Sequence, residues 1–231
     1  MNTIICGDLH GKLEVAKAVL DIYKDKKIVF IGDYLDSFTE SIASQASLMH
    51  LLLDAHRDPK RDVTVLLGNH EMSYLDNRHR CSGWNLSMSS HVLPVERELY
   101  GLPSFVWVNG YLVSHAGVSK QLLRVIGGSD KLTKLEEARY LREYLRNGQF
   151  HEIGYARGGN SPVGGLMWCD WFEEFVPLTV ANQVVGHSGY RRSSGPQGVL
   201  EKDGNYNIDC LDHTQEVLSI SEAGVVEIIS L

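Results

Sequence analysis

The chain has 231 residues and a formal net charge of −7, with 43% hydrophobic and 22% charged residues. This is the composition of a globular protein that can bury a core without disulfides, and its length fits one large α/β domain or two small ones. The acidic balance argues against broad, non-specific binding to nucleic acid. No apolar run reaches the roughly 18–20 residues of a membrane helix, so no membrane association is expected.

The four cysteines are far apart and form no C-x-x-C pair: Cys6, Cys81, Cys169 and Cys210. Scattered cysteines are typical of reduced thiols in a cytosolic protein, and none has the histidine partner that a cysteine nucleophile needs. Residues 1–11 lack a basic region followed by a long apolar one, so no signal peptide is predicted. We therefore expect a cytoplasmic protein.

In the first third of the chain, short apolar runs alternate with segments of helical periodicity. Strands are expected at 2–6, 27–32 and 62–68, and helices at 12–24 and 40–56. This alternation predicts β-α-β units and a parallel sheet. In such sheets, ligands bind outside the carboxyl ends of the strands.

The middle of the chain begins with a loop at 77–85 and a short helix expected at 91–102. Two strands around an Asn-Gly turn follow at 105–117, and then a charged helix at 133–148 that ends at a glycine. Residues 154–165 form a glycine-rich loop.

The last third is rich in strand patterns at 183–187, 198–209 and 216–229. Asp-Gly and Ala-Gly pairs inside these segments predict antiparallel ribbons. No repeat, low-complexity tract or linker divides the chain, so we expect a single domain over residues 1–231.

Polar side chains with flanking glycines follow the predicted strands: Asp8, His10, Asp33, Asp36, Asn69, His70, His115 and His187. Taken alone, each motif could be a strand-to-helix turn or contain a core histidine. In the segment VLLGNHE, however, a turn needs Gly68 but has no use for His70. Carboxylate, amide and imidazole donors together suit Mn²⁺, Fe or Zn²⁺. Five such motifs at successive strand ends therefore indicate one metal site.

The motifs GDLHG, GDYLD, GNHE, SHAG and GHS occur in this order between Gly7 and Ser188. With them the chain resembles the calcineurin-like metallophosphoesterases, specifically the phosphoprotein-phosphatase-like branch of serine/threonine protein phosphatases. The resemblance covers most of the chain. It implies an α/β fold with a four-layer β-sandwich of two mixed sheets flanked by helices, and two metal ions at the edge of the sheets.

The resemblance also implies a role for each motif residue. One metal ion would be bound by Asp8 and His10, with Asp33 bridging to a second ion bound by Asn69, His115 and His187. His70 would act as general acid, oriented by Asp36. The two divalent ions, with Mn²⁺ as first choice and Fe or Zn²⁺ as alternatives, would activate a bridging hydroxide that attacks phosphorus directly.

One departure from the family pattern concerns the phosphate. Members of this branch usually have an arginine where this chain has Ser37, and serine cannot give the bidentate, charged contact of an arginine. Arg157, next to the glycine-rich loop, is the first candidate to replace it, followed by Arg80 and Arg191, with Arg78 and Arg192 nearby. The loop lacks the Gly-Lys-Ser/Thr of a nucleotide P-loop, which argues against an ATPase.

The function predicted from these residues is hydrolysis of phosphomonoesters in a small molecule or a phosphoprotein, with phosphoserine and phosphothreonine among the candidates. The missing arginine leaves hydrolysis of phosphodiesters or dinucleoside polyphosphates open as an alternative. A catalytically inactive binding module with this fold is a third alternative, although the complete ligand set and His70 argue against it. Packing in the core is the expected role of Trp84, Trp168 and Trp171. The sequence leaves the oligomeric state open.

Overall fold

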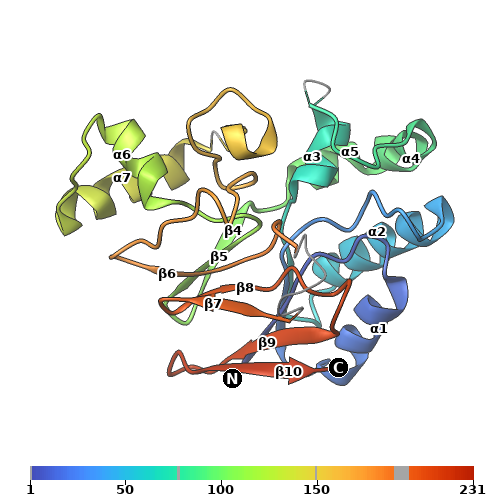
Figure 1. Cartoon of the computed structure of the whole chain (residues 1–231). Coiled ribbons are helices and arrows are strands. Elements are labelled where there is room, and N and C mark those ends of the chain that lie inside the picture. The colour runs from blue at the N-terminus through green and yellow to red at the C-terminus, as the bar shows by residue number, and fades with distance from the viewer. Residues whose placement is uncertain (1, 77–78, 149, 190–197) are drawn as a thin grey trace.

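The computed structural model describes residues 2–76, 79–148, 150–189 and 198–231. Two five-stranded sheets lie against each other, and helices cover their outer faces (Figure 1). Every helix in these ranges is too short or too polar to span a lipid bilayer.

The first sheet has the strand order β10-β9-β1-β2-β3. Its strands β1 (Thr3–Cys6), β2 (Lys27–Phe30) and β3 (Val63–Val65) are parallel, as the β-α-β pattern predicts. An antiparallel ribbon of β9 (Glu216–Ile220) and β10 (Val226–Ser230) pairs with β1 from the other side. The first and last strands of the chain therefore belong to one sheet.

The second sheet has the order β4-β5-β6-β8-β7. The strands β4 (Phe105–Val108) and β5 (Tyr111–Ser114) form the predicted hairpin. Next to it, β6 (Asn182–Val185) and β8 (Asn205–Asn207) run parallel to β5, and β7 (Leu200–Lys202) is antiparallel to β8. Both sheets are mixed, which confirms the expected fold class.

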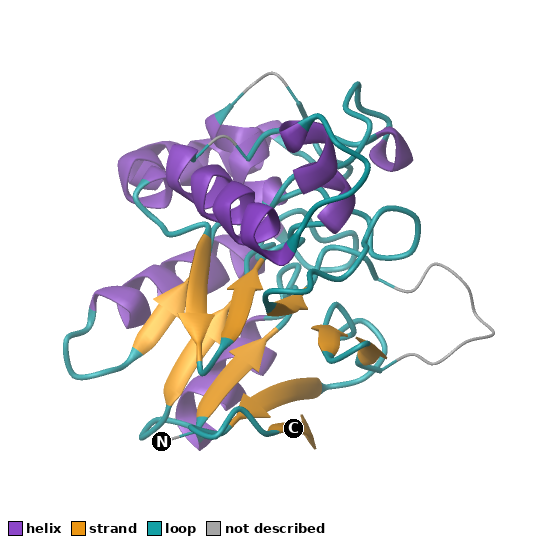
Figure 2. Cartoon of the chain, turned by 90° about the vertical axis from the view of Figure 1, so that its left-hand side faces the viewer, coloured by secondary structure: helices purple, strands orange, loops and turns teal. Residues whose placement is uncertain are grey.

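The helices of the described residues are α1 (Leu13–Ile22), α2 (Ile42–Arg57), α3 (Asn69–Leu75), α4 (Leu86–Val92), α5 (Glu96–Tyr100), α6 (Lys120–Gly127) and α7 (Lys134–Asn147), with short 3₁₀ turns η1 (Leu93–Val95) and η2 (Tyr155–Arg157). Figure 2 shows that the loops gather between the tips of the strands and the helices above them.

The expected helix at 91–102 is wrong in its extent. The helical segment begins earlier, at α4, because Asn85 caps it by accepting a hydrogen bond from Ser87 N at 2.8 Å. It then passes through the 3₁₀ turn around Pro94 before α5, since proline has no N–H to continue an α-helix. Helix α6 had no counterpart among the expected elements.

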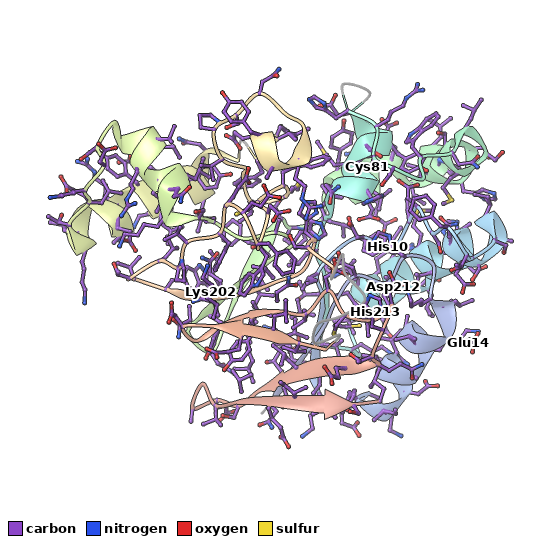
Figure 3. The ribbon with its side chains drawn as sticks, in the orientation of Figure 1. His10, Glu14, Cys81, Lys202, Asp212 and His213 are labelled. Carbon is purple, nitrogen blue, oxygen red and sulfur yellow. The ribbon has the colours of Figure 1, made fainter. Side chains whose placement is uncertain are left out.

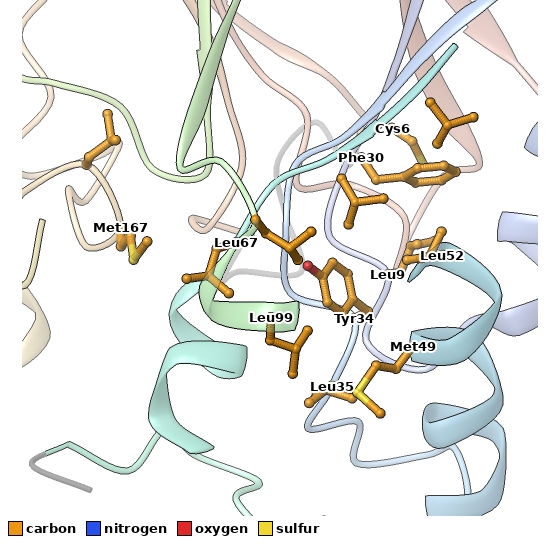
Figure 4. Packing of buried hydrophobic residues seen from close by; sticks show 14 of the residues in the cluster. Cys6, Leu9, Phe30, Tyr34, Leu35, Met49, Leu52, Leu67, Leu99 and Met167 are labelled. Atoms are coloured by element: carbon orange, nitrogen blue, oxygen red, sulfur yellow. The ribbon is translucent and has the colours of Figure 1, made fainter. Parts of the chain in front are cut away.

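Alternation along the strands separates the layers of the core. Ile4 and Cys6 of β1 pack towards α1 and α2, whereas Ile5 packs between the two sheets with Val29 and Val184. Figure 4 shows the first of these layers, where Met49 and Leu52 of α2 lie over the sheet. Complete burial of a side chain of this size contributes about 1.5–3 kcal/mol, so these layers hold the strands in register. The result is that the carboxyl ends of β1, β2, β3, β5, β6 and β8 meet at one edge.

Candidate active site

Most of the polar residues predicted from the motifs lie at this edge and are buried. Asp8 follows β1, Asp33 follows β2 and Asn69 follows β3, while His115 follows β5 and His187 follows β6. Their exposed fractions are 2%, 1%, 2%, 0% and 8%. Burying so many polar groups without ordinary partners is costly, so their arrangement needs an explanation.

Four donor atoms converge on one point between the sheets. The amide oxygen Oδ1 of Asn69 lies 2.7 Å from His115 Nε2 and 2.9 Å from His187 Nδ1. The two imidazole nitrogens are 3.2 Å apart, and His115 Nε2 is 3.3 Å from Asp33 Oδ2. Side chains from three strand ends and from the start of α3 thus meet in one small volume.

The hydrogen bonds around this point leave lone pairs facing one another. His115 Nδ1 lies 3.1 Å from the carbonyl oxygen of Ile31, which can only accept, so Nδ1 carries a proton and, in the neutral imidazole, the lone pair of Nε2 faces Asn69 Oδ1. The Asn69 amide donates from Nδ2 to Cys81 Sγ at 3.1 Å, which turns Oδ1 towards His115. Acceptors that face acceptors in a buried site repel unless a cation lies between them. The geometry therefore fits a divalent metal ion.

His10 and Asp8 offer a second set of donors near Asp33. His10 Nδ1 lies 2.8 Å from the carbonyl oxygen of Leu35, so its Nε2 is the bare nitrogen, and it lies 3.9 Å from Asp33 Oδ2. Asp8 Oδ2 accepts from His187 N at 2.9 Å, whereas Asp8 Oδ1 is buried and has no hydrogen-bond partner among the described residues. Two groups of side chains that share Asp33 have donor atoms close enough together to hold a metal ion: His10, Asp33 and His70, and Asp33, His115 and His187.

Without a bound cation, the pKa values of several acidic and basic groups at this edge lie outside their usual ranges. Burial, with Asp209 and Asp33 nearby, raises the pKa of Asp8 well above its usual range. For Asp33, burial also favours the neutral acid, but the imidazoles of His115 and His70 hold its pKa well below the usual range. Burial lowers the pKa of His187, so its imidazole is neutral. A bound divalent ion would favour the charged form of both carboxylates.

The backbone at these residues is strained. His10, Asp33, Asp36 and His187 have φ angles of 39°, 54°, 61° and 68°, in the left-handed region that few residues other than glycine adopt. Such conformations cost about 1–3 kcal/mol each and concentrate at functional sites. They direct the side chains off the strand tips. Gly68 is also needed here, because a Cβ at this position would lie 2.3 Å from Asp33 Oδ1.

Glu71 ties the strained turns together. Its completely buried carboxylate accepts four backbone hydrogen bonds, from Asp33 N and Tyr34 N at 2.9 Å and from Leu35 N and Gly68 N at 3.1 Å. Burial and the neighbouring Asp33 raise its pKa to about 7. The sequence suggested only that Glu71 begins the next helix. It does lie in the first turn of α3, but it also holds the turn that follows β2.

His70 lies between Asp36 and Asp33. Its Nδ1 lies 2.9 Å from Asp36 Oδ2, and its Nε2 lies 3.8 Å from Asp33 Oδ2. Because Asp36 accepts a hydrogen bond from Nδ1–H, the other ring nitrogen, Nε2, remains to face the cleft that His70 lines. Burial opposes the charged imidazole, but Asp33 and Asp36 outweigh it and raise the pKa of His70 to about 9.

A cleft of about 430 Å³ opens over these groups. Its floor includes His10, Asp33 and His70, and Arg157 and Trp168 lie on its walls. A groove of similar volume, about 450 Å³, lies between β4 and α7, but its lining is apolar apart from two arginines and includes no histidine or carboxylate. We therefore place the candidate site in the cleft on the basis of its chemistry.

Arg157 is the best-fixed of the predicted phosphate-binding arginines. Its Nε lies 2.8 Å from Asp170 Oδ2, and its Nη2 donates to the carbonyl oxygen of His187 at 3.1 Å and to Ser188 Oγ at 2.8 Å. The glycine-rich loop that carries Arg157 is held by Glu174, which accepts from Gly164 N at 2.9 Å. The guanidinium is therefore directed along the wall of the cleft.

The other candidate arginines for phosphate binding are placed differently from Arg157. Arg80 lines the cleft and lies over the ring of Trp84, 4.0 Å from its centroid. Arg191 lies outside the described residues, as do Arg78 and Arg192. Ser37 accepts from Thr39 N and Glu40 N and so closes a local turn, and it does not line the cleft.

Two residues of the site were missed from the sequence. Asp209, two residues after β8, lies close enough to raise the pKa of Asp8. Its strand-then-acid pattern resembles the one before Asp8, but it lacks a flanking glycine. Cys81 orients the Asn69 amide, and burial raises its thiol pKa to about 12, which agrees with the expectation that it is not a nucleophile. Figure 3 shows Cys81 above His10 at the edge of the sheets.

The tryptophans have separate roles. Trp171 stacks on Phe175 in the core, with ring centroids 4.6 Å apart, as expected. Trp168 is partly buried against the main core, as expected, but it also lines the cleft and contacts the ring of His187 edge-on at 5.7 Å. Trp84 stacks on Tyr74 at 5.6 Å.

Comparisons with known proteins agree with this geometry. The family model described as calcineurin-like phosphoesterase matches residues 1–209. Among solved structures, a cold-active protein-tyrosine phosphatase from a psychrophilic Shewanella species has a TM-score of 0.59 at 18% identity, covering 99% of this chain and 80% of the other. A protein serine/threonine phosphatase from Saccharomyces cerevisiae also has a TM-score of 0.59, at 14% identity, covering 100% and 80%. At such identities the likeness concerns the fold. No curated protein sequence matches.

Replacing Glu71 with alanine tests whether this carboxylate holds the site. The change leaves four buried N–H groups without their acceptor, and each unpaired group costs about 1–3 kcal/mol. We expect the free energy of unfolding to fall by at least about 3 kcal/mol, and bound metal to fall with it because the Asp33 turn is released. Denaturant unfolding and elemental analysis measure the two effects.

The matched control for this substitution is Glu14→Ala, because Glu14 is an exposed glutamate paired only with Lys17. It should change stability by less than about 0.5 kcal/mol. A Glu71→Ala protein as stable and as fully metal-loaded as this control would contradict the assigned role.

Proposed function

The chain belongs to the calcineurin-like phosphoesterase family, and from that premise we propose that it hydrolyses phosphomonoesters in the cleft at the edge of the two sheets. It is a metal-dependent phosphoesterase by family membership. The finer assignment to monoesters rests on the residues around the cleft. The proposal takes residues 1–231 as one catalytic domain, since the first and last strands pair in the same sheet.

In this proposal Asp8, His10 and Asp33 would hold one metal ion, and Asp33, Asn69, His115 and His187 would hold the other. The lone pairs that face one another around Asn69 Oδ1, and the unpartnered Asp8 Oδ1, support both positions. When bound, two divalent ions neutralise phosphoryl oxygens and make a nucleophile from water near neutral pH. The mixed oxygen and nitrogen donors favour Mn²⁺, with Fe or Zn²⁺ as alternatives.

The residues of the chain supply the rest of the reaction. Arg157 binds a phosphoryl oxygen from the wall of the cleft, a charge-assisted contact. The oxygen of water forms the new bond to phosphorus on the face opposite the leaving oxygen. His70 gives the proton on Nε2 to the leaving oxygen as the bond between that oxygen and phosphorus breaks. The hydrogen bond from His70 Nδ1 to Asp36 is kept throughout. The products are inorganic phosphate and an alcohol.

The observation that carries the proposal is the position of Arg157 and His70 around one cleft. His70 is fixed by Asp36, and Arg157 is fixed by Asp170, which is 2% exposed. An arginine that lines the same cleft as His10, Asp33 and His70 suits the terminal phosphate of a monoester, which carries more charge than a diester. Both similar phosphatases are described as protein phosphatases, so a phosphorylated protein side chain is one substrate class to test.

A panel of substrates tests the proposal. The Mn²⁺-loaded protein is assayed with p-nitrophenyl phosphate, bis-p-nitrophenyl phosphate, a dinucleoside polyphosphate and a phosphoserine peptide. We expect the highest kcat/KM with a monoester. Preference for the bis ester or the dinucleoside compound would overturn the monoester assignment, and no turnover of any substrate by metal-loaded protein would indicate the inactive binding module.

The metal content gives a prediction that does not depend on turnover. Elemental analysis after reconstitution with Mn²⁺ should give about two ions per chain, the number that a shared carboxylate between two donor groups predicts. Asn69→Ala should reduce this to about one, because Asn69 serves only the second position. Asn147→Ala, at the exposed end of α7, is the control and should keep the wild-type content. Equal content in all three proteins would remove Asn69 from the ligand set.

The role of His70 predicts a leaving-group dependence. His70→Asn should retain both metal ions and the fold, and lower kcat by about 10²–10⁴-fold for an ester whose leaving oxygen needs a proton. The loss should be much smaller with p-nitrophenyl phosphate, whose leaving group departs as an anion. Steady-state kinetics with the two esters measure this difference. If metal ions were lost with the imidazole, His70 would be a ligand instead.

The role of Arg157 predicts weaker binding of the phosphate. Arg157→Ala removes a charge-assisted contact worth about 1.5–3 kcal/mol, which corresponds to a drop in kcat/KM of roughly 10- to 100-fold. Arg157→Lys keeps the charge but not the planar fork, and should recover only part of the loss. Arg142→Ala, on the exposed face of α7, is the control. An Arg157→Ala enzyme as fast as this control would transfer the role to Arg80 or Arg191.

A further inference from the structure

A tyrosine lies behind the pair formed by His70 and Asp36. Tyr74 is one turn after His70 on α3, and its hydroxyl donates a hydrogen bond to Asp36 Oδ1. The other carboxylate oxygen, Asp36 Oδ2, lies 2.9 Å from His70 Nδ1. Burial and the Asp36 carboxylate raise the pKa of Tyr74, so the phenol keeps its proton and remains the donor.

The chain fixes the tyrosine from its other side. Asn85 N donates to the Tyr74 hydroxyl at 2.9 Å, so the phenol oxygen has both a donor and an acceptor in place. The ring of Trp84 stacks on the Tyr74 ring, with centroids 5.6 Å apart and an interplanar angle of 21°. Two independent contacts thus set the position of the hydroxyl, and both come from residues that follow one another in the loop before α4.

The same loop packs directly on Asp36. A Cβ at Gly83 would lie 2.9 Å from the carbonyl oxygen of Asp36 and 3.1 Å from its Cβ, which leaves no room for a side chain there. Asp36 itself is 2% exposed and has a φ of 61°. The aspartate is therefore enclosed by this loop, Tyr74 and His70.

The carboxylate needs such a partner to orient an imidazole. A carboxyl group turns easily about the bond between Cβ and Cγ, because terminal torsions of this kind have broad minima. One hydrogen bond to His70 leaves this rotation open, whereas a second hydrogen bond on the other oxygen fixes the plane of the group. The plane of Asp36 in turn fixes the ring of His70 and the direction of its Nε2.

We propose that Tyr74 is a positioning residue for the proton transfer by His70, acting through Asp36. The proposal rests on the proposed function, in which His70 is the general acid. Tyr74 does not line the cleft and touches neither substrate nor metal. Its contribution is to keep His70 Nε2 directed at the leaving oxygen.

The test compares Tyr74→Phe with wild type in their Mn²⁺-loaded forms, with phenyl phosphate and p-nitrophenyl phosphate as substrates. The substitution keeps the ring that stacks on Trp84 and removes only the hydroxyl. We expect kcat for phenyl phosphate to fall roughly tenfold, a part of the 10²–10⁴-fold that a general acid supplies, with KM unchanged. The loss should be no more than about threefold for p-nitrophenyl phosphate, whose leaving group needs little proton transfer.

Tyr100→Phe is the matched control. The Tyr100 hydroxyl donates to the carbonyl oxygen of Leu75 at 2.6 Å, so this change also removes a tyrosine hydrogen bond to α3, but one that does not reach Asp36. Both variants should keep the wild-type metal content, and Tyr74→Phe should lose more Tm because its hydroxyl makes two hydrogen bonds and that of Tyr100 makes one here. Only Tyr74→Phe should change the ratio of kcat between the two esters.

A double-mutant cycle completes the test. In a His70→Asn background, Tyr74→Phe should cause no further loss with phenyl phosphate, because the group that it positions is absent. A full additional loss there, an equal loss with both esters, or the same kinetics as Tyr100→Phe would overturn the proposal while leaving the phosphomonoesterase function intact. Absence of turnover of both esters by the wild-type enzyme would instead refute the proposed function, and the role of Tyr74 with it.

Discussion

The site depends on one buried carboxylate. Glu71 accepts hydrogen bonds from the turn after β2 and from the turn after β3, and so joins two segments that the sheet alone brings only near each other. Because these turns carry Asp33 and Asn69, the distance between the metal-binding positions is set by backbone hydrogen bonds. A charged acceptor is suited to this because hydrogen bonds to ionised groups are roughly twice as strong as neutral ones.

The strain at the strand tips is the cost of this arrangement. The left-handed backbone at His10, Asp33 and His187 is unfavourable, and the donor atoms that it brings together repel one another. Packing between the sheets and the helices supplies the stability that offsets both terms. A divalent ion removes the repulsion between the donor atoms when it binds. The apoprotein is therefore held in a conformation that suits the metal.

A second set of buried carboxylates holds the residues that we propose contact the substrate. Asp170 pairs with Arg157, and Glu174 accepts hydrogen bonds from the glycine-rich loop, while Asp36 fixes His70. Asp170 and Asp36 each set the direction of a basic side chain, whereas Glu174 holds the backbone of the loop. The same edge of the sandwich therefore combines a rigid metal centre with two basic groups directed into one cleft.

The sequence by itself determined the β-α-β order, the hairpin at Asn109-Gly110, and nearly the whole set of strand-end donors, because periodicity and glycine placement are local properties of the chain. Tertiary structure alone decided that Glu71 joins two turns, that Cys81 and Asp209 belong to the site, that Trp168 lines the cleft, and that Tyr74 meets Asp36. Each of these depends on contacts between segments that are separated in the sequence. The local pattern around a residue does not show which distant group the residue will contact in the fold.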